Sequence, residues 1–364
     1  NKEITVEAGI KISEFLNFVL NFHLWIPQLP GYPYISLGGA VATNAHGKSC
    51  GIHGTIRNSI KKILLFHKVH GWLNLSNYEN KEIFDLTIGG LGLTGTIVSI
   101  TFSLTEFDFT DFTTIKKKVF SVQDTLKNLS GYAKNKNIYI YSWNTIGDLE
   151  NFGKGYVFEN IPKKNSKKIL KIKALRKHNY GFPFCLWNNL TIKLFNKIYS
   201  KYLDFEKQNK NESFLKTIFP FVGKESYFKL FGSKGFLESQ LLVQNDVVDS
   251  FLEEVKKLYE IYQPSITLFS LKILSGEQKF LRFEGDGVWV TFDLVNNKNS
   301  HLFLEKIDEL CIKYKAIPSI IKDSRLRHEI FEKCYNESEE FKKKLISFDR
   351  DRVYQSELSK RLKI

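Results

Sequence analysis

Residues 30–48 carry the residue types best suited to chemistry, because small residues and paired glycines lead there into a histidine and a lysine. Gly38 and Gly39 have no Cβ, so the backbone can come close to a flat or phosphorylated ligand. His46 and Lys48 follow where that approach would end. A simple turn needs one glycine and none of these neighbours. The spacing predicts a ligand-binding loop, although His46 taken alone would more often be a structural histidine.

A second glycine cluster, Gly90–Gly95, matches the G-x-G-x-x-G pattern of dinucleotide-binding proteins. That fingerprint requires a strand before the glycines and a helix after them, so that the pyrophosphate meets a helix N-terminus. Here a helical pattern over 80–86 comes first, and the alternating strand pattern of 96–104 follows. The order argues against a Rossmann domain. It predicts a tight glycine turn packed near a cofactor.

Metal chemistry finds little support in the sequence. His67 and His70 form an H-x-x-H pair, but two ligands on a turn are too few for a metal site. The four cysteines are far apart and lack C-x-x-C spacing: Cys50, Cys185, Cys311 and Cys334. We therefore expect no metal and no disulfide framework, as is usual in a reducing cytoplasm.

The bulk composition is that of a globular protein with two or three domains. The chain has 364 residues, 43% of them hydrophobic and 25% charged, and no apolar run reaches transmembrane length. The net charge of +14 is spread along the chain, so most of it should be solvated surface. A phosphate-bearing substrate or a membrane surface is the alternative. Because the sequence has no Met and starts within a strand-like run, we expect an N-terminal part and methionines to be missing.

Hydrophobic periodicity places the remaining elements. Near the N-terminus it predicts a strand over 3–8, a helix over 12–22, and strands over 63–67 and 72–75. Further on it predicts a helix over 121–135 and a strand over 138–143, whereas 160–215 is basic and aromatic without a clear period. The last part is regular, with strands over 236–243, 265–273, 287–295 and 317–321 and helices over 246–262 and 301–314. This order predicts an antiparallel sheet with helices on one face.

Three separated segments resemble the FAD-dependent oxidases of the vanillyl-alcohol oxidase superfamily, and within it the family of bacterial decaprenylphosphoryl-ribose oxidases. They are residues 30–48 with 89–97, the Lys-Asp-Ser-Arg motif at 322–325, and the C-terminal residues 349–364. Members of that family form the flavin subunit of an epimerase that makes the arabinose donor of mycobacterial cell walls. The resemblance implies a bound FAD cofactor.

The resemblance also carries the family's FAD contacts onto this chain. They are Gly31, Ser36, Leu37, Gly38, Gly39, Thr43, Asn44, Ala45, His46, Ile97 and Ser319. The family has a tyrosine where this chain has Ser319. The segment that wraps the FAD pyrophosphate would precede Asn1.

The family's active-site lysine beside the flavin corresponds to Lys322, and we expect His46 to position the cofactor near the substrate. The implied substrate contacts are Gln240, Lys272 and Thr291, and from its place after His46 we expect Lys48 to contact the substrate as well. The family has a cysteine at the position of Thr291 and a glutamine at that of Glu238. These differences keep the cofactor assignment and leave the substrate open.

Lys322 also has a chemical argument of its own. A flavin that accepts hydride gains negative charge, and a fixed cation beside it stabilises that charge. Lys322 follows the apolar run 317–321, which suits this role. Without the family, a strand-end lysine paired with Asp323 would be the simpler interpretation.

Together these observations predict an α+β fold. We expect a PCMH-type FAD-binding domain over 1–109, completed by 317–364, with a substrate (cap) domain over 110–316 built on an antiparallel sheet with helices. The implied function is the FAD-dependent oxidation of a secondary alcohol of a sugar, such as a polyprenyl-phosphate-linked pentose, to a ketone. The alternatives are an aldonolactone or alditol oxidase acting on a free sugar, and a basic binding protein that keeps the fold without catalysis.

The expected partners follow from this function. They are a sugar or lipid-linked sugar and a reductase that completes an epimerase pair, with no nucleic acid. We expect a cytoplasmic protein that touches the inner membrane surface. The aromatic segment 180–187 is apolar enough to contact a prenyl chain, and equally suited to be core.

Overall fold

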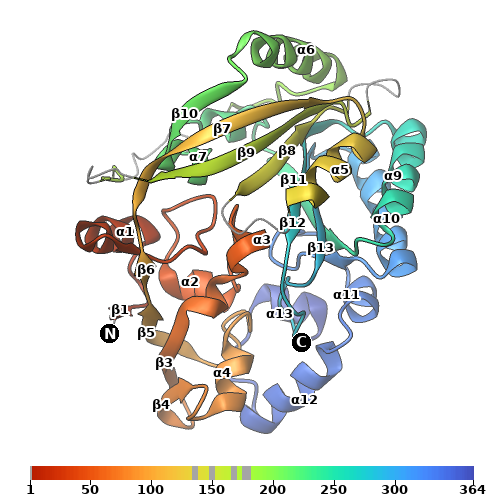
Figure 1. Cartoon of the computed structure of the whole chain (residues 1–364). Coiled ribbons are helices and arrows are strands. Elements are labelled where there is room, and N and C mark those ends of the chain that lie inside the picture. The colour runs from red at the N-terminus through yellow and green to blue at the C-terminus, as the bar shows by residue number, and fades with distance from the viewer. Residues whose placement is uncertain (1, 133–137, 147–151, 165–169, 174–181) are drawn as a thin grey trace.

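The N-terminal part of the computed structural model is built on a four-stranded antiparallel sheet (Figure 1). The structure describes residues 2–132, 138–146, 152–164, 170–173 and 182–364. The strands, in their order across the sheet, are β1 (Glu3–Glu7), β5 (Thr96–Ser103), β3 (Ile60–His67) and β4 (Gly71–Ser76). Alternate apolar side chains of β3 and β5 are buried, as expected for strands with one face on a core.

Short helices pack around this small sheet. They are α1 (Ile12–Val19), η1 (Leu20–Phe22), α2 (Leu37–Ala42), α3 (Cys50–His53), η2 (Ile56–Ser59) and α4 (Lys81–Thr87). Phe15 of α1 meets Phe102 of β5 with ring centroids 5.7 Å apart, inside one core cluster. A two-stranded pair, β2 (Leu24–Trp25) with β6 (Thr105–Glu106), leads toward the rest of the chain.

The larger part of the molecule is an eight-stranded antiparallel sheet. In order across the sheet, its strands are β10 (Asn209–Ser213), β7 (Phe109–Val119), β9 (Gly155–Lys164), β8 (Tyr139–Asn144), β12 (Ile266–Leu274), β13 (Gly287–Val295), β11 (Phe236–Val243) and β14 (Ile317–Pro318). The remaining short helices are α7 (Phe214–Ile218) and α8 (Ser226–Lys229).

The two faces of the large sheet differ in what covers them. Helices α5 (Val122–Tyr132), α9 (Val248–Tyr262) and α10 (Lys298–Tyr314) share one core cluster with side chains such as Val290 and Phe292 of β13. The alternate residues of β13, Trp289 and Thr291, point to the opposite face. That opposite face carries α6 (Asn189–Phe205) and, farther along, the N-terminal elements. We call it the site face.

The C-terminal segment joins both parts of the molecule. After β14, which pairs with β11, it forms α11 (His328–Cys334), α12 (Ser338–Phe348) and α13 (Glu357–Leu362). Helix α12 lies against α4, and the two occupy the end of the molecule opposite α6 (Figure 1). The H-x-x-H histidines serve this packing: His67 lies 3.7 Å from Asp349, and His70 hydrogen-bonds the Phe348 carbonyl at 2.6 Å.

The mixed helices and antiparallel sheets confirm the predicted α+β class. The helix before the glycine turn and the strand after it are also confirmed as α4 and β5. The 17-residue helix α6 was not predicted, and the strand expected over 317–321 has only two residues. The division at 109/110 and 316/317 stays a prediction about domains. Within the described ranges, no helix is both long and apolar enough to cross a membrane.

Candidate flavin and substrate site

Helix α2 packs closely against the end of β1, and a glycine makes this close approach possible. A Cβ at Gly38 would lie 2.9 Å from the Ala8 Cβ, and the Gly38 amide donates a 2.8 Å hydrogen bond to the Ala8 carbonyl. Ser36 caps the helix, because its hydroxyl accepts a hydrogen bond from the Gly39 amide at 3.2 Å. A side chain at Gly38 would therefore push α2 away from β1.

The chain after α2 turns sharply at Asn44, which has the left-handed φ of 48°. Its amide nitrogen donates to Glu284 at 2.9 Å, and the Thr55 hydroxyl donates to the other oxygen of that carboxyl at 3.2 Å. Burial raises the pKa of Glu284. A Cβ at Gly47 would lie only 1.8 Å from the Leu29 carbonyl oxygen, so the backbone here admits no other residue without a shift.

The glycine turn at 89–95 closes over the C-terminal end of α2. The amides of Gly89 and Leu91 donate to the carbonyls of Val41 and Ala42 at 3.0 and 2.9 Å. A Cβ at Gly89 would lie 2.8 Å from Cγ of Arg282. The turn thus fixes a backbone corner beside α2, as its helix-then-strand order predicted.

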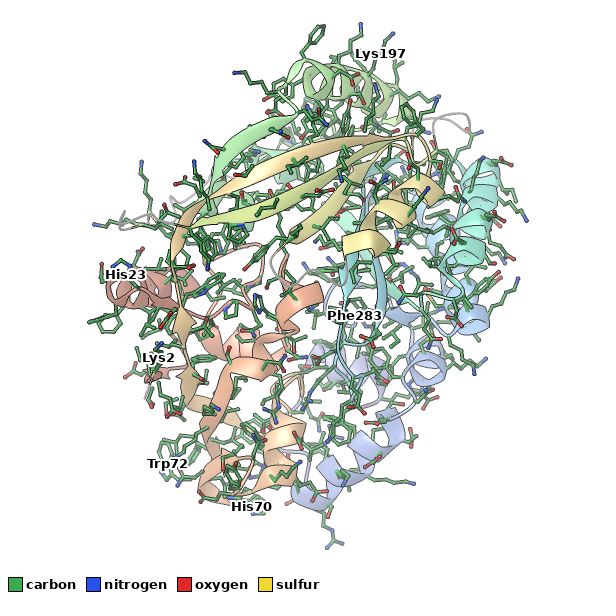
Figure 2. All side chains as sticks on the ribbon, in the orientation of Figure 1. Lys2, His23, His70, Trp72, Lys197 and Phe283 are labelled. Carbon is green, nitrogen blue, oxygen red and sulfur yellow. The ribbon has the colours of Figure 1, made fainter. Side chains whose placement is uncertain are left out.

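His46 connects the α2 region to the large sheet. Its ring lies 4.5 Å from the Trp289 ring and 5.5 Å from that of Phe283. Figure 2 shows Phe283 in the middle of the molecule, between the N-terminal elements and the large sheet. Burial, and then the charges of Lys272 and Lys322, lower the pKa of His46 to about 3. The ring is therefore neutral at physiological pH.

Cross-strand neighbours on the site face bring the predicted substrate residues together. Gln240 pairs with Thr291, and Lys272 with Trp289, whose ring lies 4.0 Å from the lysine Nζ. The Ser319 amide donates to the Gln240 carbonyl at 2.8 Å. Residues from β11, β12, β13 and the segment after β14 therefore meet in one place, next to His46.

Several charges share this place. Lys322 lies 3.2 Å from Oε2 of Glu238, and the Gln240 amide donates to Oε1 of the same carboxyl at 2.6 Å. On the neighbouring strand, Asp293 accepts a hydrogen bond from the Tyr227 hydroxyl at 3.0 Å. Burial, and then the charge of Glu238, raise the pKa of Asp293.

Two lysines in the site sit on aromatic rings. Lys48 lies 3.9 Å above the Tyr141 ring and donates to the Thr217 carbonyl at 2.5 Å. Lys272 lies over Trp289 as described. Burial lowers the pKa of both lysines, well below its usual value for Lys48. Both side chains still keep part of their surface accessible, and such lysines can meet a ligand anion.

The polar atoms around His46 test whether a flavin fits. Among the described residues, several buried polar atoms lack a hydrogen-bond partner: Asn44 Oδ1, His46 Nδ1, Gln240 Oε1, Trp289 Nε1 and Ser319 Oγ. Unpaired buried groups are costly, so such a cluster points to a polar ligand. Three of them belong to predicted FAD contacts, namely Asn44, His46 and Ser319. The backbone of α2, with Gly38 and Gly39, lies beside them. The residues present fit a flat, polar, heteroaromatic group.

The other predicted FAD contacts lie along the same backbone. Leu37 and Ala45 are buried, and Thr43 donates its hydroxyl to the Gly39 carbonyl at 2.8 Å. Ile97 precedes Val98, whose carbonyl accepts the Ala8 amide at 2.9 Å beside Gly38. A Cβ at Gly31 would meet nothing within 4 Å, so protein packing alone does not require this glycine. The contacts of these residues with FAD stay predictions.

Sequence reasoning missed the connection between β12 and β13. Its residues reach the N-terminal part, where Arg282 donates to the carbonyls of Ile88 and Asp85 at 3.0 and 2.8 Å. Glu284 and Phe283 from the same connection contact Asn44 and His46. The signal was a charged, glycine-containing stretch between two apolar strands, which reads as an ordinary surface loop.

Comparisons with known proteins agree with this geometry. Residues 1–69 match the FAD binding domain family. The chain is 24% identical to a decaprenylphosphoryl-beta-D-ribose oxidase of Mycolicibacterium smegmatis over 373 residues, which cover 99% of this chain and 81% of the relative. It is 32% identical to an L-gulonolactone oxidase of Scyliorhinus torazame over 101 residues, or 28% of this chain and 22% of the relative.

A third relative is a D-arabinono-1,4-lactone oxidase of Debaryomyces hansenii, 27% identical over 99 residues that cover 27% of this chain and 18% of the relative. All three relatives are named as oxidases, and the FAD-binding match includes α2 and His46. The chain is therefore an FAD-dependent oxidoreductase that acts on CH–OH groups, and its residues 1–69 are similar to the FAD binding domain family.

Proposed function

We propose that this protein oxidises a secondary alcohol of a sugar to a ketone, and that the sugar is a pentose linked to a polyprenyl phosphate. The likeness along 99% of the chain to an oxidase of such a compound supports this substrate class. Bound FAD supplies the hydride acceptor. A partner reductase that returns the ketone to the epimeric alcohol belongs to the same proposal, as does peripheral contact with a membrane.

The observation that carries the proposal is that two lysines of the site, Lys48 and Lys272, each lie over an aromatic ring. Within the described part of the chain, neither Lys48 nor Lys272 forms an ion pair with a carboxylate, and their ammonium groups lie over the rings of Tyr141 and Trp289. Their depressed pKa values reflect burial with other lysines nearby, an environment that an anionic group would relieve. A substrate phosphate meets this need, whereas a neutral free sugar does not.

The remaining residues of the site have proposed roles that follow from their contacts. Gln240 and Thr291 contact the sugar, and His46, neutral and held between two rings, positions the flavin. Lys322 places a cation beside the flavin and stabilises the negative charge of its reduced form. The residues proposed to hold FAD are Gly31, Ser36, Leu37, Gly38, Gly39, Thr43, Asn44, Ala45, His46, Ile97 and Ser319.

The hydroxyl proton needs an acceptor within the same cluster. Glu238 is held between Gln240 and Lys322, at 2.6 and 3.2 Å. Each oxygen of this carboxylate has a second lone pair, so Glu238 can still take the hydroxyl proton, and Lys322 then remains as the cation beside the flavin. We assign Glu238 this role in this chain.

The second candidate is a lactone or alditol oxidase that acts on a small free sugar. The 32% identity to an L-gulonolactone oxidase over 101 residues favours it. That likeness covers about a quarter of this chain, whereas the likeness to the decaprenylphosphoryl-ribose oxidase covers nearly all of it. The longer match includes the site face, and we therefore prefer the lipid-linked pentose.

Substrate comparison tests the proposal directly. Turnover of a short-chain prenyl-phosphoryl pentose should exceed that of free alditols and aldonolactones, and its KM should rise with salt because the phosphate is held by lysines. Lys272→Gln should raise this KM about tenfold, whereas exposed Lys61→Gln, on β3, should not change it. Faster turnover of the free sugars with no salt dependence would assign the protein to the small-sugar oxidases.

A further inference from the structure

Helix α6 packs on the large sheet through one narrow face. It begins after Asn188, whose side chain accepts hydrogen bonds from the amides of Leu190 and Thr191, both at 3.0 Å. Ile192 and Leu203 are buried toward the sheet. Tyr199 meets Trp143 of β8 edge-on, with ring centroids 4.7 Å apart. Asparagine capping and this packing hold α6 in place.

The opposite face of α6 is apolar and exposed. Leu190, Leu194, Ile198 and Tyr202 recur every four residues, so they form one stripe along the helix. Their exposed fractions are 76%, 57%, 59% and 57%. Phe205 continues the stripe at the helix end and is 89% exposed. A surface helix normally presents polar residues outward, so this stripe marks an interaction surface.

The apolar surface extends beyond the helix. Trp187 lies edge-on to Phe195 of α6, with ring centroids 5.5 Å apart. Just before it, Phe184 and Leu186 are 61% and 38% exposed, and the Leu186 amide is fixed on the Leu230 carbonyl at 2.8 Å. We call the exposed apolar side chains of 182–186 and α6 the α6 surface.

The charges beside the α6 surface are mostly positive. Lys193, Lys197 and Lys201 are exposed on α6, and Figure 2 shows Lys197 at the end of the molecule where α6 lies. Residues 182–203 contain these three Lys and no Asp or Glu. The acidic residues that follow, Asp204 and Glu206, are paired with Lys118 at 2.8 Å and with Lys210 at 2.6 Å.

We propose that the α6 surface docks on an anionic lipid bilayer. Apolar side chains that enter the acyl boundary, with lysines at the level of the headgroups, are the features of an interfacial helix. A second copy of this chain would bring lysines against lysines, because Lys193, Lys197 and Lys201 lie beside the apolar stripe. Charge complementarity therefore favours an anionic membrane as the occupant.

The position of α6 relative to the site deepens the proposed function, on which this link rests. Leu268 of β12 packs in the cluster beneath α6, and Lys272 lies four residues along the same strand on the same face. At about 3.3 Å per residue, the two are separated by roughly 13 Å. A prenyl chain held in the membrane could thus present its sugar phosphate to Lys272 without leaving the bilayer.

Vesicle sedimentation of the full-length flavoprotein tests the proposal. The protein should sediment with phosphatidylglycerol vesicles at low salt, and much less with phosphatidylcholine vesicles. Ile198→Glu should weaken binding at least about tenfold, because it places a charge in the apolar boundary. Replacing Lys193, Lys197 and Lys201 by Gln should weaken it by about two orders of magnitude, at roughly fivefold per lysine. High salt should reduce binding of the wild type.

Val69→Glu is the matched control. Val69 is 64% exposed, similar to Ile198, but lies on the turn between β3 and β4 at the other end of the molecule. Figure 2 shows the neighbouring Trp72 at that end, far from Lys197. The Val69→Glu variant should bind vesicles like the wild type.

Three results would overturn the proposal. They are a wild-type protein that stays in the supernatant, an Ile198→Glu variant that binds anionic vesicles as well as the wild type, and a wild-type dimer in sedimentation velocity that Ile198→Glu dissociates. Oxidation of a detergent-soluble short-chain substrate should be equal in the wild type and Ile198→Glu. That assay separates failure of membrane docking from failure of the proposed reaction.

Discussion

The α2 region and the site face hold the two halves of the site by different means. Around α2 the backbone is fixed by its own hydrogen bonds and by glycines that no larger residue could replace, such as Gly38 and Gly47. On the site face, lysine and carboxylate side chains from separate strands lie close together, among them Lys272, Lys322 and Asp293. The first region shapes a place for a flat group, and the second supplies the charge for a substrate.

The difference shows where tolerance to change should lie. A Cβ at Gly38 or Gly47 would press on a backbone carbonyl, which cannot move away as a side chain can. A changed side chain on the site face leaves the sheet intact and alters only the electrostatics. Substitutions in the first region should therefore abolish cofactor binding, and those in the second should change rates and affinities.

The largest effect is expected at Gly39. A Cβ there would lie 3.1 Å from the Ser36 hydroxyl that caps α2, and further side-chain atoms would occupy the proposed approach of the flavin. Gly39→Val should yield folded protein without bound flavin, as measured by absorbance and circular dichroism. Gly9→Val, where a Cβ meets nothing within 4 Å, should keep its flavin. A normal flavin content in Gly39→Val would break the contrast between the regions.

A smaller effect is expected on the site face. Lys322→Ala should slow flavin reduction by roughly 10²–10³, the scale of one lost electrostatic stabiliser, while flavin content stays unchanged. Rapid-reaction kinetics measure this step, and exposed Lys61→Ala serves as the control. An unchanged reduction rate would remove Lys322 from the mechanism.

The sequence predicted the α2 region better than the site face, for physical reasons. Glycine spacing and helix-strand order are local features, and they led correctly to the turn at Gly90–Gly95. The site face depends on pairing between strands distant in sequence, such as Gln240 with Thr291. Residue types alone place these positions in strands but not side by side, so the resemblance to a family had to bring them together.

Two further features escaped the sequence. Helix α6 was missed because it has apolar residues on its exposed face as well as on its buried face. The sequence therefore lacks the usual amphipathic period of a surface helix. The roles of Arg282 and Glu284 were missed because a long connection between strands carries them into the other half of the molecule. Such contacts follow from tertiary packing, which no local pattern encodes.

The smallest expected effect is a difference in the pH dependence of stability between Asp293 on the site face and Asp85 in α4. The raised pKa of Asp293 means that folding favours its protonated form, so the folded state loses stability as pH rises from about 3.9 through the folded pKa. Asp293→Asn removes this loss and keeps an acceptor for Tyr227. Its melting temperature should rise above that of the wild type by about 2–4 °C at pH 8, with a smaller difference at pH 4.

Asp85 in α4 provides the opposite case. Although burial raises its pKa, the hydrogen bond from Lys81 and the charges of Lys279 and Arg282 lower it to about 2. Its stabilisation is present above about pH 3.9 and is lost as pH falls through about 2. Asp85→Asn should therefore lower the melting temperature at neutral pH. If the melting temperature changed in the same direction in Asp293→Asn and Asp85→Asn, the opposite effects expected for the two carboxyls would be contradicted.

An anaerobic titration followed by visible absorbance tests the central claim most directly. The purified full-length protein should show the spectrum of bound FAD, and a prenyl-phosphoryl pentose should bleach it with release of a keto sugar. A folded protein with no flavin, or a bound flavin that no sugar alcohol bleaches, would contradict the account.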